Sequence, residues 1–188
     1  ALSQCIESHW SLNSTKKSRE YSLAGLKAIT SNYKSYLMND LEASRAVMRG
    51  ANFSGKAINI TRTTAPHALS YKITKEYGIP HGCAVAVTLM QFWNHLLLNL
   101  DETTHPDGKG FMEERLKELS CAFGGENLLD GRKIADKMII DILPKKDIQI
   151  DDVQKIISEV NADRLRNYPL SLNMQDLESI LSQTIKQL

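Results

Sequence analysis

Two histidines in the middle of the chain, His67 and His81, have the types and the spacing to share one metal ion. His67 follows Pro66, which is typical of the first turn of a helix, and His81 follows a Gly-Ile-Pro turn and opens the next helix. Two imidazoles at two helix starts, joined by one helix and a tight turn, can face the same small volume. Histidine is a frequent metal ligand, and two histidines with a carboxylate form a known site for a divalent transition metal.

The alternative is that each histidine is structural and hydrogen-bonds to backbone or water at the start of its helix. Fourteen positions separate His67 from His81, and this spacing is less specific than an HExxH motif or paired CxxC motifs. The spacing alone therefore leaves both interpretations open.

The composition is that of an ordinary soluble globular protein. The 188 residues are 42% hydrophobic and 24% charged, and the formal net charge is +1, so neither nucleic acid nor a membrane surface is an expected partner. The longest apolar stretch, 83–100, is interrupted by polar residues and falls short of a membrane span. Cys5, Cys83 and Cys121 show no CxxC spacing, which indicates free buried thiols in a reducing, cytoplasmic compartment.

The apolar periodicity predicts helices along almost the whole chain, and no sustained alternation predicts a strand. We therefore expect one all-α domain over residues 1–188. The predicted helices are 1–10, 14–37, 40–60, 66–77, 81–100, 111–123, 128–143, 151–160 and 174–187.

Capping residues and composition refine several of these helices. The predicted N-caps are Asn13 or Ser14, Asn39 or Asp40, and two capping boxes, Asp151 with Gln154 and Asn173 with Asp176. The helix over 40–60 is rich in Ala and Gly, which predicts a central helix packed closely on all sides. The helix over 81–100 is expected to be buried, and the polar segment 101–110 to be a loop with a solvated His105.

Several motifs of nucleotide binding and hydrolysis are absent from the sequence. It has no GxGxxG, GxxxxGK[ST], GxSxG, HExxH or EF-hand pattern. A nucleotide-binding activity would therefore have to come from residues outside this chain.

The segment 55–82 resembles the C-terminal metal-binding domain of the group III, iron-containing alcohol dehydrogenases, whose superfamily includes glycerol dehydrogenase and dehydroquinate synthase. In that family one histidine precedes a short helix and a second lies in a Pro-His-Gly turn, as His67 and Pro80-His81-Gly82 do here. The opening segment 1–8 and the closing segment 161–181 also resemble the family's first and last helices. The resemblance covers essentially the whole chain and implies the all-α fold of that domain.

The resemblance implies His67 and His81 as metal ligands, with Gln4 at a position where the family often has another histidine. The family's aspartate ligand would fall immediately before Ala1. Because an amide oxygen is a weaker ligand for a transition metal, we expect poor metal affinity of this chain by itself. Glu7 could contribute a carboxylate, although a surface or indirect role suits it better. Tyr71 falls where many family members place a further histidine in the substrate cavity, and it is our candidate catalytic residue.

The resemblance also implies a two-domain, homo-oligomeric enzyme. An N-terminal domain, absent from this chain, would bind NAD(P), and this domain would hold Fe²⁺ or Zn²⁺ to polarise a carbonyl or alkoxide during hydride transfer. The sequence of segment 54–71 is similar to that of a phosphonoacetaldehyde reductase-like subgroup of the family. This resemblance implies a small aldehyde or alcohol substrate that can bear a phosphonate. Lys56, Arg62 and Lys72 are cations near the histidines that could meet such a group.

Two other functions remain open at this point. The first is a metal-dependent lyase similar to dehydroquinate synthase, which NAD(P)H turnover with an aldehyde would exclude. The second is an inert helical interaction module, which a glycine-rich nucleotide domain upstream would argue against. We expect the chain alone to be inactive, whichever of these holds.

Overall fold

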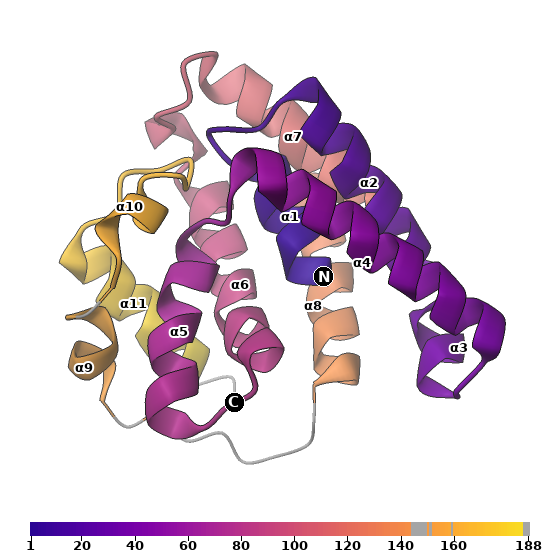
Figure 1. The fold of residues 1–188 in the computed structure, drawn as a ribbon. Helices are drawn as coiled ribbons and strands as arrows, with labels where there is room; N and C mark the ends of the chain where they lie inside the picture. The colour runs from indigo at the N-terminus through magenta and orange to yellow at the C-terminus, as the bar shows by residue number, and fades with distance from the viewer. Residues whose placement is uncertain (144–149, 151, 159, 186–188) are drawn as a thin grey trace.

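The computed structural model describes residues 1–143, 150, 152–158 and 160–185, and this part of the chain is built from helices. The expected all-α domain is confirmed there: an isolated bridge between Thr103 and Leu170 is its only β feature. The helices, labelled as in Figure 1, are α1 Leu2–Trp10, α2 Lys16–Thr30, α3 Tyr33–Leu37, α4 Leu41–Thr61, α5 Ala65–Tyr77, α6 His81–Leu98, the 3₁₀ turn η1 Leu100–Glu102, α7 Gly108–Ala122, α8 Leu128–Ile142, α9 Val153–Ile157, α10 Ala162–Leu165 and α11 Met174–Ile185.

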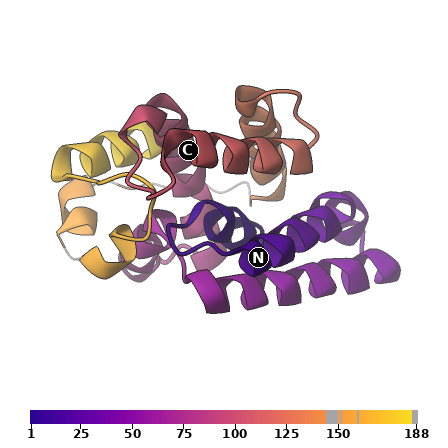
Figure 2. The same cartoon turned by 90° about the horizontal axis from the view of Figure 1, so that it is seen from above.

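The helices form two groups that are joined by α1 and by α8, since α8 contacts both α7 and α6. In the first group α1 and α2 lie between α4 on one side and α7 on the other, as the view from above shows (Figure 2). In the second group α5 and α6 run side by side, with α11 against α6 and α9 against both α5 and α11 (Figure 1). Because α1 contacts α6 as well as α2 and α4, its N-terminal turn lies close to the start of α6.

The second predicted helix, 14–37, proved to be two helices with a different cap. Thr15 is the N-cap of α2, where its hydroxyl accepts a hydrogen bond from the Ser18 amide and the Ser18 hydroxyl accepts one from the Thr15 amide. The helix ends at Thr30 because the Asn32 side chain donates to the carbonyl of Ala28 and competes with the backbone there. Asp40 is confirmed as the cap of α4.

The later boundaries also differ from the prediction in places. α6 ends at Leu98 rather than at residue 100, and α9 is shorter than 151–160 and is capped by Asp152. The predicted cap Asp151 lies outside the described residues, as does residue 187 at the predicted end of the last helix. The capping box of Asn173 with Asp176 is confirmed, with both hydrogen bonds formed.

Of the glycines and alanines of α4, Ala43, Gly50 and Ala57 are buried while Ala51 and Gly55 are exposed, so the prediction of a helix packed on all sides was wrong. Gly50 crosses Gly25 of α2 so closely that a Cβ on Gly25 would lie 3.1 Å from the Gly50 carbonyl oxygen. The opposite face carries Leu41 and Met48, both exposed. Small residues recur about every seven positions, which permits one close helix crossing rather than contact all round.

The core confirms the buried character expected of α6, with Trp93 fully buried. His105 is also buried, stacked on Phe111, so its predicted solvation was wrong, because the α7 start folds back over the loop. Of the three thiols Cys5 is buried, Cys83 is half-buried and Cys121 is exposed, so the prediction of buried thiols holds fully for Cys5 alone. No described helix combines the length and the apolar run that crossing a lipid bilayer takes.

Candidate functional site

The structure brings the two histidines together at the N-terminal ends of α5 and α6. His67 lies in the first turn of α5, after Pro66, and His81 is the first residue of α6. Their ring centroids are 5.4 Å apart. A single helix and one turn connect them, so the short segment between them suffices to fix their relative position.

Glu7 of α1 orients His67 from the buried side. Its carboxylate is fully buried, and one oxygen accepts hydrogen bonds of 2.8 Å from both the amide and the hydroxyl of Thr64. The other oxygen bonds to Nδ1 of His67. A carboxylate only accepts, so we assign the proton to Nδ1, which leaves the Nε2 lone pair of His67 directed away from Glu7.

His81 is oriented in a similar way by Ser70. The Ser70 hydroxyl donates to the His67 carbonyl at 2.8 Å and lies 3.4 Å from Nδ1 of His81. Burial, followed by the neighbouring His67, lowers the pKa of His81 and favours the neutral imidazole. A neutral ring whose Nδ1 is hydrogen-bonded to Ser70 has an unprotonated Nε2, and the lone pair of that nitrogen is available to a metal ion.

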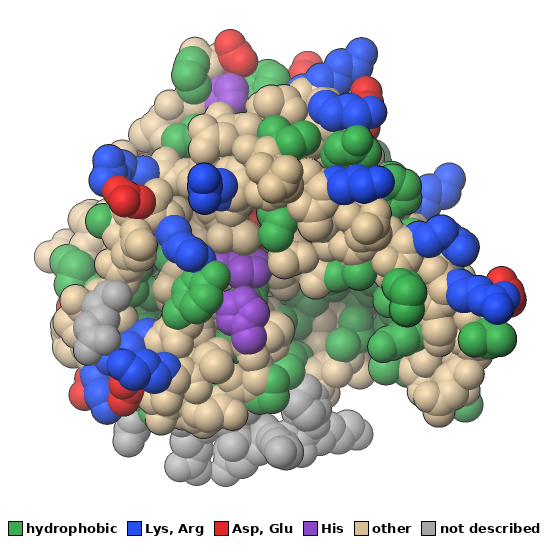
Figure 3. All heavy atoms as spheres, in the orientation of Figure 1, with side chains coloured by type: hydrophobic (Ala, Val, Ile, Leu, Met, Phe, Trp, Pro, Cys, Tyr) green, Lys and Arg blue, Asp and Glu red, His purple; other side chains and the backbone are tan. Residues whose placement is uncertain are grey.

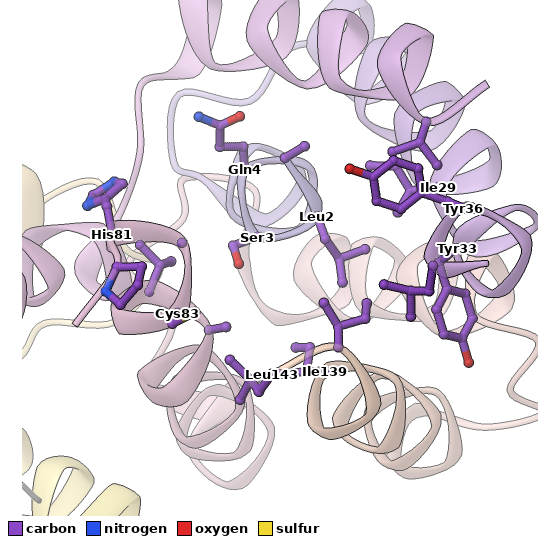
Figure 4. A pocket seen from close by; sticks show the side chains of 18 of the residues that line it. Leu2, Ser3, Gln4, Ile29, Tyr33, Tyr36, His81, Cys83, Ile139 and Leu143 are labelled. Carbon is purple, nitrogen blue, oxygen red and sulfur yellow. The ribbon is translucent and has the colours of Figure 1, made fainter. Parts of the chain in front are cut away.

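Gln4 and the two histidines line one cavity of about 450 Å³. The amide oxygen of Gln4 accepts a hydrogen bond of 2.9 Å from the Ser54 hydroxyl of α4, which holds the side chain in place. Figure 4 shows Ser3 and Gln4 projecting from α1 and His81 and Cys83 projecting from the start of α6 around the same space. The remaining wall is mostly apolar and includes Leu2, Ile29, Tyr33, Tyr36, Ile139 and Leu143.

The chemistry of these donors fits a borderline divalent metal such as Fe²⁺ or Zn²⁺. Two imidazole nitrogens are the kind of ligand that these ions prefer, and hydrogen bonding of His67 to Glu7 is the usual support for a metal-bound histidine. The described residues contain no group of three His, Cys, Asp or Glu side chains placed to hold an ion. What His67, His81 and Gln4 offer at this cavity is two imidazole nitrogens and one neutral amide oxygen.

Tyr71 lies next to His81 but outside the apolar cavity. Its ring centroid is 5.2 Å from that of His81, and the side chain is 49% exposed. The guanidinium carbon of Arg164, from α10, lies 4.4 Å from the centre of the tyrosine ring. Tyr71 thus forms one wall of a separate, polar hollow that also contains Arg62 and Arg164.

The three cations expected near the substrate have different surroundings. Lys56 lies over the rings of Tyr21 and Phe53 on the far side of α4, and Lys72 is buried and pairs with Glu76. Arg62 is the one of the three that lines the hollow beside Tyr71.

Sequence reasoning missed Arg164 altogether, and it undervalued Glu7 as an orienting group. Arg164 is far from the histidines along the chain and lies on a four-residue helix that has too few residues to show a period. For Glu7 a signal was present, since it lies one turn after Ser3 on the apolar helix α1 and is one of the few charges on that helix.

Comparison with known proteins agrees with this fold. A family model described as the C-terminal part of the Fe-containing alcohol dehydrogenase family matches residues 1–185. The phosphonoacetaldehyde reductase of Streptomyces viridochromogenes is 33% identical over 129 residues, which cover 66% of this chain and 32% of that protein.

Solved structures share the fold. An iron-containing alcohol dehydrogenase from Thermococcus thioreducens superposes with a TM-score of 0.84 at 17% identity and covers 100% of this chain and 49% of its own. A sulfoacetaldehyde reductase from Bifidobacterium kashiwanohense, solved in complex with NAD⁺, gives a TM-score of 0.83 at 20% identity, over 100% of this chain and 48% of its own.

The chain belongs to the iron-containing alcohol dehydrogenase family, and it corresponds to the C-terminal domain of that family. It spans about a third of the length of the curated relative and about half of the length of the solved structures.

Proposed function

We propose that this chain is the metal- and substrate-binding domain of an NAD(P)-linked alcohol dehydrogenase or aldehyde reductase. The observation that carries the proposal is the buried Glu7 carboxylate that orients His67 beside His81. A histidine that holds a metal commonly has a carboxylate behind it, and here a second imidazole, that of His81, lies beside the supported ring.

In this proposal His67 and His81 hold the ion through Nε2, and the amide oxygen of Gln4 supplies a weaker third contact. The bound Fe²⁺ or Zn²⁺ would supply Lewis-acid polarisation of a carbonyl oxygen while the nicotinamide, bound by another domain, supplies the hydride. Glu7, Thr64 and Ser70 act on the histidines alone, since their hydrogen bonds fix which nitrogen of each ring faces the ion.

Tyr71 is the candidate catalytic residue. Its hydroxyl can donate a hydrogen bond to a substrate oxygen, and the ring is held between His81 and Arg164. The apolar cavity beside the histidines excludes water from one side of the reacting carbonyl. Hydrogen bonds and charge interactions with the carbonyl oxygen are stronger where water is excluded.

We propose a small aldehyde or alcohol as the substrate, with a phosphonate-bearing aldehyde as one member of the class. The names of the relatives support this, since they are reductases and dehydrogenases rather than lyases. All three cysteines are free thiols, which supports the proposed cytoplasmic compartment, and a homo-oligomer remains part of the proposal.

Metal binding and turnover test the proposal together. Co²⁺ can be titrated as a visible-absorbing substitute for Zn²⁺ into the full-length protein that carries this domain. The proteins compared are wild type, His67→Ala, His81→Ala and the control His105→Asn, whose imidazole stacks on Phe111. We expect both alanine variants to lose the visible absorption of bound Co²⁺, and the control to keep it. The protein that carries this domain should also oxidise NAD(P)H with a small aldehyde, and both alanine variants should abolish that turnover. Metal retained at full stoichiometry in either alanine variant would exclude these ligands.

A further inference from the structure

A basic hollow lies beside the histidine pair, on the side away from the apolar cavity. Its polar walls include Arg62, Tyr71, Arg164 and Arg166, and one carboxylate, Asp163, also lines it. A second hollow, which contains Lys72 and Lys75, shares Tyr71, Asn161 and Arg164 with the first. Figure 3 shows histidine side chains near the centre of this face with Lys or Arg side chains beside them. Because Tyr71 and Arg164 line both hollows, this stacked pair forms the wall between them.

Two of the arginines in this hollow have no acidic partner. Arg166 pairs with Asp163, and both side chains are largely exposed. In the described part of the chain, no carboxylate lies within ion-pair distance of Arg62 or Arg164. Two guanidinium groups without a counterion attract an anion, and their planar N–H forks match two oxygens of a phosphonate or sulfonate.

Stacked contacts hold Arg164 in a fixed relation to the histidines. Its guanidinium lies over one face of Tyr71, and the ring of Tyr71 is in turn tilted against His81. The short helix that carries Arg164 is capped by the Asn161 side chain, which accepts from the Asp163 amide at 2.9 Å. A group bound to Arg164 is therefore held one tyrosine ring away from His81.

The backbone at Arg62 is strained and is held in that state from behind. Its φ of 61° with ψ of −177° lies in a region that side-chain-bearing residues rarely adopt. Asn167 donates to the carbonyls of Thr61 and Thr63, at 2.6 Å and 3.0 Å, and so clamps the chain on both sides of Arg62. Strain of this kind persists where the surroundings impose it, and it is commonest at binding sites.

We propose that Arg164, assisted by Arg62, binds a tetrahedral oxyanion at the far end of the substrate, so that the domain prefers aldehydes with a phosphonate or sulfonate group. The inference rests on the proposed function, because it takes His67 and His81 as the place of the reacting carbonyl. The same chemistry could recognise a phosphate of the cofactor, and the experiment separates the two sources.

The binding test uses this chain with two matched probes, ethylphosphonate and the neutral 1-butanol. Adenosine diphosphate is the third probe and stands for the cofactor phosphates. The variants are Arg164→Gln, Arg164→Lys, Arg62→Gln and the control Arg45→Gln, which removes an exposed arginine that pairs with Glu42 on α4 and lines neither hollow. Each variant is first shown to keep the far-UV circular dichroism of the wild type, and binding is followed by NMR titration.

We expect the wild type to bind ethylphosphonate saturably and more tightly than adenosine diphosphate. Arg164→Gln should weaken ethylphosphonate binding roughly tenfold or more, as expected for a lost charge-assisted hydrogen bond, and Arg164→Lys should recover part of it. Arg62→Gln should weaken it less, and the control Arg45→Gln should change it by no more than about twofold. Binding of 1-butanol should be the same in all five proteins.

Three outcomes would overturn the inference: no saturable binding of ethylphosphonate by the wild type, equal binding by a folded Arg164→Gln, or preferential binding of adenosine diphosphate that depends on Arg164. In the NAD(P)H-coupled assay of the full-length protein that carries this domain, Arg164→Gln should raise KM for phosphonoacetaldehyde by a much larger factor than KM for acetaldehyde. If that full-length wild type reduces no aldehyde at all, the proposed function fails, while the titration still decides whether the oxyanion site exists.

Discussion

Replacing Glu7 by glutamine tests whether His67 is oriented for metal binding. The carboxylate is fully buried and forms three hydrogen bonds, two from Thr64 and one from His67. An amide of the same shape keeps an oxygen for Thr64 but turns its NH₂ group toward Nδ1 of His67. His67 would then have to carry its proton on Nε2, the atom that is proposed to bind the metal.

The magnitudes follow from the number and kind of contacts that change. Loss of one charge-assisted hydrogen bond in a buried position costs about 1.5–3 kcal/mol of folding free energy. Metal affinity should fall roughly 10- to 100-fold, the usual effect of removing a carboxylate behind a ligating histidine. Urea unfolding followed by circular dichroism measures the first quantity, and Co²⁺ titration of the folded protein measures the second.

Glu118→Gln is a matched control, because Glu118 also pairs with a buried histidine, His9, at 2.9 Å but on the α7 side of the fold. It should lower stability and leave Co²⁺ affinity unchanged. The reasoning is refuted if Glu7→Gln binds Co²⁺ as tightly as wild type, or if both variants lose affinity to the same extent.

Three further predictions concern the elements that position the site. Gly25→Ala should destabilise the fold by roughly 1–3 kcal/mol, because a Cβ there would lie 2.6 Å from Sγ of Cys5. Gly55→Ala has open space around it and should stabilise the fold by up to about 1 kcal/mol. The midpoints of urea unfolding measure both changes. Glu76→Gln should lower the urea midpoint at neutral pH, because the hydrogen bond from Lys155 lowers the pKa of Glu76 to about 2 in the folded protein. The difference from wild type should vanish as the pH falls from 4.5 toward 2, where the carboxylate is protonated. A difference that does not change with pH would contradict this. Asn167→Ala should cost about 1–3 kcal/mol, because it removes the amide that donates to the Thr61 and Thr63 carbonyls. Ethylphosphonate binding should weaken as well, and the same titrations measure it.

Much of the helical framework could be predicted from local sequence. Apolar periodicity and a cap such as Asp40 were enough for the long helices, because each depends on residues a few positions apart. The break after Thr30 was missed since it depends on one hydrogen bond from the Asn32 side chain, which competes with a helix that periodicity would continue.

In the candidate site, too, residues close together in the chain could be predicted and distant ones could not. His67 and His81 could be paired from sequence because one helix and one turn connect them. Glu7 and Arg164 could not be placed in the same way, since Glu7 reaches His67, and Arg164 reaches Tyr71, from a helix distant in the chain. Their positions depend on the packing of α1 against α6 and of α10 against α5.

The two sides of the histidine pair impose opposite demands on a substrate. On one side the cavity of about 450 Å³ is walled mainly by apolar side chains such as Leu2 and Ile139, where an anion would lose its hydration without a partner. On the other side Arg62 and Arg164 offer cations in an open, hydrated hollow. An aldehyde with an oxyanion therefore has one favourable orientation, with the carbonyl at the histidines and the charge on the arginine side. A neutral aldehyde lacks that constraint. Selectivity for the charged substrate should therefore arise from the fixed orientation of its carbonyl as well as from its tighter binding.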